Sequence, residues 1–341
     1  MNQGSVNVRA QIVTNYARLR DLQGDYEGLE VRSFSREPKT IWTICKLFFK
    51  SRKSDYLILD FADSFWSFAA MKLLMPLSRI KLVTVDLLVA DSHTLRDRLE
   101  YFIKRILLGR AYKFLVHQRN TAMYQSYFSI TADKFYYLPF KVNGLEIIKS
   151  ITPTDQGYVF CGGKSRRDFP TLIEAARSLP YPVTIVTTGK QDLAHHGSYL
   201  QEANLPPNVT PKRLAGIGQA LPFIQYMAAS RLVVIPLLKN AFTQAGIAVY
   251  LQAMALGKCV IISAGPGIED VIPADCAIIV PPGNPDALRE AIRSMWLDDS
   301  RRESIAANGK RYALGLGGEE RLFRDIIRWA IDDRQASDAK A

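Results

Sequence analysis

The sequence predicts an α/β protein made of two doubly wound domains, each a parallel sheet covered by helices. Three observations support this prediction: short apolar runs rich in Val and Ile, helical periodicity between those runs, and the same alternation in both halves of the chain. Strands that are apolar along their whole length and are separated by helices are typical of a parallel sheet buried on both faces. A length of 341 residues suits about two domains.

The first half of the chain has five apolar runs that we expect to be strands. They are Leu29–Phe34, Tyr56–Phe61, Ile80–Asp86, Lys113–His117 and Phe135–Leu138. Helical periodicity predicts helices near 6–22, 41–52, 64–76, 94–109 and 119–128. A polar stretch over 142–156 then separates the two sheets, so the expected domains are 1–148 and 149–317.

The second half repeats this pattern more clearly. The expected strands are Gly157–Cys161, Pro182–Thr187, Arg231–Pro236, Lys258–Ser263 and Cys276–Val280. The expected helices lie near 168–179, 220–229, 245–256 and 285–297. A last helix is expected within 318–334, followed by a frayed tail.

The composition excludes several classes of protein. Hydrophobic residues make up 48% and charged residues 23%, which is the balance of a folded globular chain rather than a disordered one. The four cysteines lie far apart and the four histidines have no zinc-ligand spacing, so we expect neither a disulfide framework nor a metal site. No apolar run reaches the roughly 18 residues of a membrane span, and no secretory signal is recognisable. We expect a cytoplasmic protein.

Positive charge is concentrated in the first half. Residues 1–150 carry 23 Lys and Arg against 14 Asp and Glu, a net +9, whereas 151–341 carry 21 against 19, a net +2. Such a surface suits nucleic acid, anionic lipid or an anionic substrate. No nucleic-acid-binding motif is present, so nucleic acid is not an expected partner. Ile41–Lys53 and Thr94–Lys113 combine basic and apolar residues, which predicts either docking on an anionic membrane surface or packing on the sheet.

Ligands of open parallel sheets bind beyond the carboxyl ends of the strands, so the loops that follow the strands are the candidate sites. The first such loop contains Gly162, Gly163, Lys164, Arg166 and Arg167. Its small residues and cations precede a helix start, which suits a diphosphate, although a solvated basic turn has the same composition. Asp168 is expected to cap that helix.

Two further loops have the same character. Gln244, Ala245 and Gly246 lead into a helix that contains Gln252, and two glutamines eight residues apart can share a helix face. Their amides could hold sugar or ribose hydroxyls, or they could be ordinary surface glutamines. Ser263–Asp270 follows the next strand and is either a further ligand loop or a simple turn.

The order and spacing of these loops resemble those of GT-B fold glycosyltransferases, specifically glycosyltransferase family 4. The resemblance covers about residues 157–313, through YVFCGGKSRRDFPTLIEA, VVIPL, QAGIAVYLQAMALGKCVII, GPGIEDVI and IIVPPGNPDALREAI. It implies two Rossmann-like domains facing a cleft, with the last helix returning to the first domain. It also implies transfer of a sugar from a nucleotide-diphosphate donor, a UDP-sugar rather than a GDP-sugar, to a glycan or lipid-linked glycan acceptor.

The resemblance also implies roles for the candidate residues. Gly162 and Gly163 would admit the diphosphate, while Lys164, Arg166 and Arg167 would neutralise it without a metal or a cofactor. Ala245 and Gly246 would offer backbone amides to the donor. Gln244 and Gln252 would contact the sugar and the ribose. Retention of anomeric configuration is expected.

The chain departs from the family pattern in three places. Gln244 and Gln252 stand where the family usually has two glutamates. Asp86 stands where many members have a histidine, which makes it the candidate catalytic or acceptor-orienting group. The family's first strand is expected to be absent or replaced, because the segment before Leu19 suggests a loop and a helix. The glutamine pair and the expected loss of the first strand keep open an alternative, a catalytically silent protein that binds a nucleotide sugar or a partner. An epimerase of the same fold is a further alternative.

Overall fold

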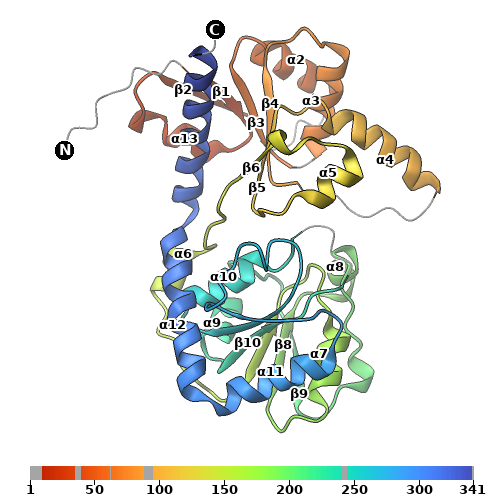
Figure 1. Cartoon of the computed structure of the whole chain (residues 1–341), viewed down its shortest axis with the longest axis vertical. Helices are drawn as coiled ribbons and strands as arrows, with labels where there is room; N and C mark the ends of the chain where they lie inside the picture. The colour runs from red at the N-terminus through yellow and green to blue at the C-terminus, as the bar shows by residue number, and fades with distance from the viewer. Residues whose placement is uncertain (1–9, 35–39, 62, 88–94, 240–243, 340–341) are drawn as a thin grey trace. The chain divides into compact units, whose positions relative to one another are not determined.

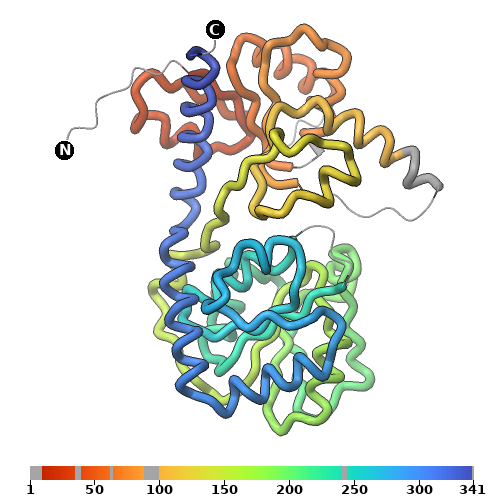
Figure 2. Tube along the Cα trace, in the orientation of Figure 1, coloured from red at the N-terminus to blue at the C-terminus, as the bar shows by residue number. Residues whose placement is uncertain are grey.

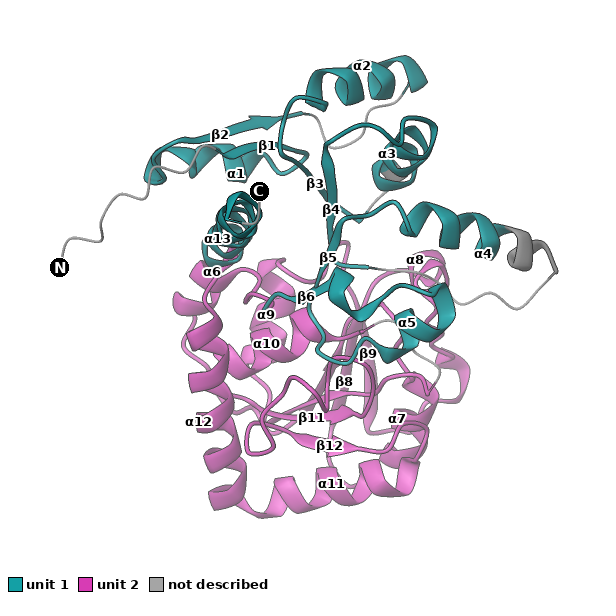
Figure 3. Cartoon of the chain, turned by 45° about the horizontal axis from the view of Figure 1, so that its top comes forward, with its two compact units in different colours: residues 1–139, 320–341 teal, residues 140–319 magenta. Residues whose placement is uncertain are grey.

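The computed structural model describes residues 10–34, 40–61, 63–87, 95–239 and 244–339. The chain divides into unit 1, Met1–Pro139 with Glu320–Ala341, and unit 2, Phe140–Glu319 (Figure 3). The boundary lies before the expected 148/149 because the chain after Phe140 already packs in unit 2. Val142 and Ile148 are buried in its core, and the Val142 N–H donates to the Gly317 carbonyl at 2.9 Å.

Unit 1 contains a six-stranded parallel sheet in the order β2-β1-β3-β4-β5-β6 (Figure 1). Its strands are β1 Ala10–Thr14, β2 Leu29–Ser33, β3 Tyr56–Asp60, β4 Lys81–Val85, β5 Lys113–Val116 and β6 Phe135–Tyr137. Its helices are α1 Ala17–Asp21, α2 Ile41–Ser51, α3 Asp63–Leu74, α4 Leu95–Leu108, α5 Ala122–Phe128 and α13 Glu319–Asp338, with short 3-10 turns at Gln23–Asp25 and Ala132–Lys134. The doubly wound fold predicted for this half is confirmed.

The first strand is where the sequence-based prediction is wrong. Ala10–Thr14 forms β1, which pairs in parallel with both β2 and β3 and is therefore an interior strand of the sheet, next to the edge strand β2. The expected helix over 6–22 shrinks to α1, and the first strand is neither absent nor replaced. Five residues such as AQIVT are too few to show a period of two, and pairing on both sides decides their conformation.

The last helix belongs to unit 1. Along α13, Leu322, Phe323, Ile326 and Trp329 pack into the same apolar cluster as Ile12 of β1. Figure 2 shows this C-terminal helix, in blue, beside the red first strands. The helix is therefore an integral part of the N-terminal core, which agrees with the sequence-based expectation that it returns to the first domain.

Unit 2 contains a second six-stranded parallel sheet, in the order β12-β11-β10-β7-β8-β9. Its strands are β7 Val159–Gly162, β8 Val183–Thr187, β9 Val209–Arg213, β10 Leu232–Ile235, β11 Cys259–Ser263 and β12 Ile278–Val280. Its helices are α6 Leu145–Lys149, α7 Phe169–Ala176, α8 Lys190–His195, α9 Leu221–Ala228, α10 Ile247–Ala255, α11 Pro285–Leu297 and α12 Asp299–Leu316, with a 3-10 turn at Glu202–Asn204. The strand order reverses between β7 and β10, which is the position where doubly wound sheets bind ligands.

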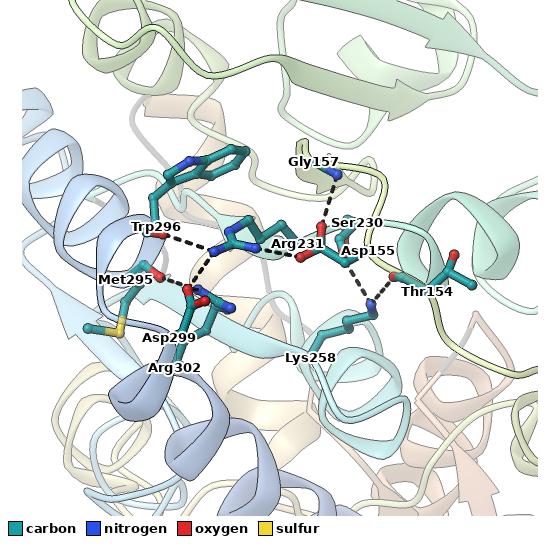
Figure 4. Close-up of polar contacts among 10 residues, drawn as sticks. All are labelled: Thr154, Asp155, Gly157, Ser230, Arg231, Lys258, Met295, Trp296, Asp299 and Arg302. Carbon is teal, nitrogen blue, oxygen red and sulfur yellow. Dashed lines mark hydrogen bonds and ion pairs between the residues drawn. The ribbon is translucent and has the colours of Figure 1, made fainter.

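The amino-terminal edge of the unit 2 sheet is closed by a polar network (Figure 4). Arg231, just before β10, forms ion pairs with Asp155 at 2.7 Å and with Asp299 at 2.5 Å. Lys258, just before β11, donates to the carbonyls of Thr154 at 2.6 Å and Ser230 at 2.7 Å. These contacts fix the segment that enters β7 to the neighbouring strand starts, so this edge is structural.

Candidate functional site

The loops that the sequence singles out come together at the carboxyl edge of the unit 2 sheet. The loop after β7 and the segment after β10 are joined by backbone hydrogen bonds, Asp168 N–H to the Pro236 carbonyl at 3.0 Å and Leu238 N–H to the Arg166 carbonyl at 3.1 Å. The Leu237 N–H donates to Ser263 Oγ, at the end of β11, at 3.0 Å. Three adjacent strand ends are thus tied into one surface at the switch point.

Arg167 lies at the centre of this surface. Its side chain is only 3% exposed, and its guanidinium donates to the carbonyls of Gly162 at 2.9 Å and Ser165 at 2.7 Å. Carbonyl oxygens position a guanidinium but do not neutralise it, and among the described residues no carboxylate pairs with it. Burial lowers the pKa of Arg167 to about 10, so it stays charged at neutral pH. A buried cation without a counter-charge is costly unless an anion binds there.

The two glycines of the first loop make room for protein side chains. A Cβ at Gly162 would lie 2.4 Å from the ring of Phe160, and one at Gly163 would lie 2.4 Å from Arg167 Nη2. Gly163 has φ +114, a conformation that other residues rarely adopt. Its N–H donates to the Val186 carbonyl at 3.2 Å. Gly163 therefore serves the placement of the Arg167 guanidinium, and the role of both glycines toward a ligand stays a prediction.

The other two cations of this loop differ from each other. Lys164 Nζ lies 3.2 Å from Asp192, which offsets its charge. Arg166 is half-buried with φ 55, and its guanidinium has no hydrogen bond or ion pair with any described residue. Asp168 caps α7 as expected, accepting the Thr171 N–H at 3.1 Å. The loop therefore presents two arginines without carboxylate partners, and one lysine that already has one.

The second loop reaches the first, but not in the way that the sequence predicts. Residues 240–243 lie outside the described residues, and α10 begins only at Ile247, after Gly246 at φ +83. Gln244 precedes the helix, so the expectation that Gln244 and Gln252 share one helix face is wrong. Because Gly246 has a left-handed conformation, α10 starts after it and does not extend back to Gln244. A Cβ at Gly246 would lie 3.8 Å from Arg167 Nη1, which places this turn beside the guanidinium.

The two glutamines have different surroundings. Gln252 is completely buried, and its amide nitrogen donates to the carbonyls of Asn143 and Gly218, both at 3.0 Å. Gln244 lies against the third loop, where a Cβ at Gly267 would fall 2.4 Å from Gln244 Oε1. Both Oε1 atoms are buried and have no hydrogen-bond partner in the part of the chain that the structure describes. Two unpartnered acceptors can each receive a hydroxyl proton, and their contact with sugar or ribose stays a prediction.

Unit 1 has a polar carboxyl edge of its own. Asp86 follows β4 with φ 68, unusual for a residue other than glycine, and its Oδ1 accepts the Leu87 N–H at 2.8 Å. The ends of the neighbouring strands β1, β3 and β5 carry Asn15, Asp60 and His117. Asn15 hydrogen-bonds Asp60 in both directions, and His117 Nδ1 lies 2.8 Å from the Leu138 carbonyl.

Sequence reasoning missed the last three of these residues. Asn15 was hidden by the misassigned first strand, and position at a strand end was the available signal for Asp60 and His117. Asp86 belongs to unit 1, whereas the loop after β7 belongs to unit 2. Within the described ranges, no group of three or more His, Cys, Asp or Glu side chains is placed to hold a metal ion.

Comparison with known proteins adds to this picture. Residues 157–298 match the model of the family described as "Glycosyl transferases group 1". None of the curated proteins matches the sequence significantly. Solved structures resemble the whole chain at low identity, which shows a shared fold.

Three of these structures illustrate the likeness. Sucrose-phosphate synthase from Thermosynechococcus elongatus is 17% identical with a TM-score of 0.69, covering 97% of this chain and 100% of that one. Anabaena HepE in complex with UDP and glucose is 14% identical with a TM-score of 0.66, covering 94% and 98%. A glycosyltransferase from Rickettsia africae is 15% identical with a TM-score of 0.63, covering 95% and 90%.

The matched family segment includes the basic loop, Gln244, Gln252 and the third loop, so the domain model and the tied strand ends point to the same edge of unit 2. Residues 157–298, within the C-terminal unit, match a glycosyl transferases group 1 domain, and the chain has the two Rossmann-like domains of the GT-B fold.

Proposed function

We propose that this protein transfers a sugar from a UDP-sugar to a hydroxyl of a glycan or lipid-linked glycan. The observation that carries the proposal is Arg167, a buried cation at the switch point of unit 2 that has no carboxylate beside it among the described residues. The diphosphate of a nucleotide sugar supplies the missing counter-charge. The choice of UDP rests on a structural neighbour, Anabaena HepE, which was solved with UDP-glucose.

Arg167 and Arg166 neutralise the charge that develops on the departing nucleotide diphosphate, which is the largest electrostatic demand of this reaction. Lys164 contributes less, because Asp192 already offsets its charge. The carbonyl oxygens of Gln244 and Gln252 accept hydroxyls of the sugar and the ribose. Because side-chain cations carry out the neutralisation, the reaction is metal-independent. On the acceptor side, Asp86 orients the attacking hydroxyl, with retention of configuration.

A panel of nucleotides tests the donor. UDP and UDP-glucose should raise the unfolding temperature more than GDP and GDP-mannose. A ligand present at 100 times its Kd adds about 2.7 kcal/mol to the free energy of unfolding. EDTA should leave both the shift and the turnover unchanged. Loss of activity with EDTA that Mg²⁺ restores would reject metal independence.

The second candidate, a silent binder of nucleotide sugars, is favoured by one observation. Gln244 and Gln252 are uncharged, and the Gln252 amide is engaged in holding two loops of unit 2. Hydrolysis or transfer of radiolabelled UDP-glucose separates the two. Tight UDP binding with no turnover on any glycan or lipid-linked acceptor would favour the binder.

We propose in addition that unit 1 docks on an anionic membrane surface. α2 exposes Ile41 and Trp42, α4 exposes Phe102 and Ile103, and both helices also carry lysines or arginines in the basic half of the chain. Nothing is described of the side chains of Leu95 and Leu99, which lie in the first turns of α4. None of the described helices is long and apolar enough to cross a membrane.

Sedimentation with vesicles tests the docking. Vesicles rich in phosphatidylserine should bind the protein and phosphatidylcholine vesicles should not, and salt should release it. Trp42→Ser should weaken binding, while the matched variant Leu221→Ser, which removes an exposed apolar residue from unit 2, should not. Equal and negligible binding to both vesicle types at low salt would leave a soluble acceptor as the better interpretation.

A further inference from the structure

Unit 1 contains a basic cavity that the proposed transfer reaction does not use. It lies at the amino-terminal edge of the unit 1 sheet and has a volume of about 470 Å³. Six of its eleven lining residues are cations and one, Asp133, is an acid. We call it the amino-edge pocket, and its cations are Lys72, Arg79, Lys81, Arg110, Lys113 and Lys134.

The fold explains why these cations meet. Lys81 begins β4, Lys113 begins β5 and Lys134 immediately precedes β6, and these three strands are neighbours in the sheet. Arg79 leads into β4 and Arg110 leads into β5. Because parallel strands all start at the same edge, the five side chains gather there. The pocket is separate from the carboxyl edge of this sheet. The opposite ends of the strands lie at that edge, with Asn15, Asp60, Asp86 and His117.

Most of the positive charge in the pocket has no negative partner. Lys72 donates to the carbonyls of Ser78 and Ile80, and Lys134 donates to those of Gly109 and Ala111. Carbonyl contacts hold an ammonium group without cancelling its charge. Burial lowers the pKa of both lysines, and for Lys134 the nearby Asp133 opposes this shift while Arg110 adds to it.

Among the described residues, the counter-charge is small. Lys81 is paired with Asp333 at 2.7 Å. Lys113 contacts the Asp133 carbonyl, and the Asp133 carboxylate lies near Lys113 and Lys134. Arg79 and Arg110 are exposed and have no ion pair or hydrogen bond with any described residue. Two acids therefore face six cations.

From this arrangement we propose that the amino-edge pocket binds a ligand carrying a phosphate monoester or a diphosphate. The two free guanidinium groups offer forked donors that match phosphate oxygens, and the lysines add point charges around them. The volume suits a small phosphorylated molecule or headgroup. Such a ligand is either free in solution or the headgroup of a phospholipid. If the ligand is a phospholipid headgroup, the side chain of Leu77, which is 95% exposed and two residues before Arg79, is placed to insert into the bilayer beside it.

Titration of inorganic pyrophosphate, with and without saturating UDP, tests the pocket apart from the donor site. The pocket variant is Arg79→Gln with Arg110→Gln, and the matched control is Arg20→Gln with Arg105→Gln, which removes the same charge from exposed positions of unit 1. We expect UDP-independent binding that weakens about tenfold or more per lost arginine in the pocket variant only. Failure of UDP to bind would reject the donor proposal and leave this comparison intact.

A second arm identifies the source of the phosphate. Vesicles containing phosphatidylinositol 4-phosphate are compared with phosphatidylserine vesicles of equal surface charge. A preference for the phosphomonoester lipid that only the pocket variant loses assigns a lipid headgroup. Pyrophosphate binding that only this variant loses, without a lipid preference, assigns a free ligand. Equal behaviour of wild type, pocket variant and control in both arms overturns the proposal.

Discussion

Two arginines at opposite edges of the unit 2 sheet show how a structural cation differs from a candidate site cation. Arg231, at the amino edge, has carboxylates at 2.7 and 2.5 Å (Figure 4). Arg167, at the carboxyl edge, is more deeply buried, and among the described residues its guanidinium donates hydrogen bonds to carbonyls alone. A structural cation is accompanied by its counter-charge in the fold, whereas no described residue supplies one to Arg167. The difference marks the carboxyl edge as the place where an anion is required.

Exchange of each arginine for methionine should separate activity from stability. Arg167→Met should lower transfer by about 10²–10³-fold, the usual loss when one stabilising donor is removed from an active site. Its effect on the free energy of unfolding should be small, because the lost carbonyl contacts are offset by removal of an uncompensated buried charge. Turnover and chemical denaturation measure the two quantities.

Arg231→Met should behave in the opposite way. It removes the cation between Asp155 and Asp299 and should lower the free energy of unfolding by about 1–3 kcal/mol, less than for a fully buried pair because Asp299 is 64% exposed and keeps its ion pair with Arg302 at 2.7 Å. Transfer per folded molecule should not change. Similar losses of activity in both variants would remove the distinction between the two edges.

The glutamines provide a second comparison. Gln252→Glu replaces a donor by a carboxylate facing the carbonyls of Asn143 and Gly218, so we expect a loss of about 2–4 kcal/mol in the free energy of unfolding. Gln244→Glu should lower the free energy of unfolding clearly less. The Gln244 amide makes no hydrogen bond with the described residues, and the positive charge of Arg167 lies near its loop. Denaturant unfolding of both variants decides the order, and equal losses would contradict the different roles assigned to the two amides.

Gly163→Ala tests the placement of the Arg167 guanidinium without substituting Arg167 itself. The new Cβ would lie 2.4 Å from Arg167 Nη2 at a strained φ of +114, so UDP affinity should fall together with stability, by about 1–3 kcal/mol. Gly157→Ala is the matched control, with φ +71 and no atom within 4 Å of the new Cβ. It should show only the backbone cost and unchanged UDP binding by calorimetry.

The fold could be predicted from sequence because most strands are continuous Val/Ile runs separated by helices. β1 and β9 could not, for physical reasons. Ala10–Thr14 is a five-residue strand next to a short helix, and Val209–Arg213 is a polar edge strand of VTPKR. For the candidate site, the sequence locates the loops, because cations and small residues mark strand ends, while the roles of their residues toward a ligand stay predictions. Which cation lacks a counter-charge depends on Asp192, Asp155 and Asp299, which only the tertiary structure places.

Lys258 allows the smallest test of the comparison, because it shares the amino edge with Arg231 but is held mainly by carbonyls. Burial lowers its pKa from 10.5 to about 8, with Asp155 opposing the shift. Between pH 8 and 10.5 the unfolded chain keeps a proton that the folded chain has released, so this group makes the free energy of unfolding rise with pH in that window. Below pH 8 both states are protonated and the contribution is constant. The stability of wild type minus that of Lys258→Met should therefore increase across the window, with the exposed-lysine variant Lys212→Met measured in parallel as the matched control. A flat difference at Lys258 would mean that the Thr154 and Ser230 carbonyls stabilise the ammonium fully, and that a buried cation at this edge needs no carboxylate.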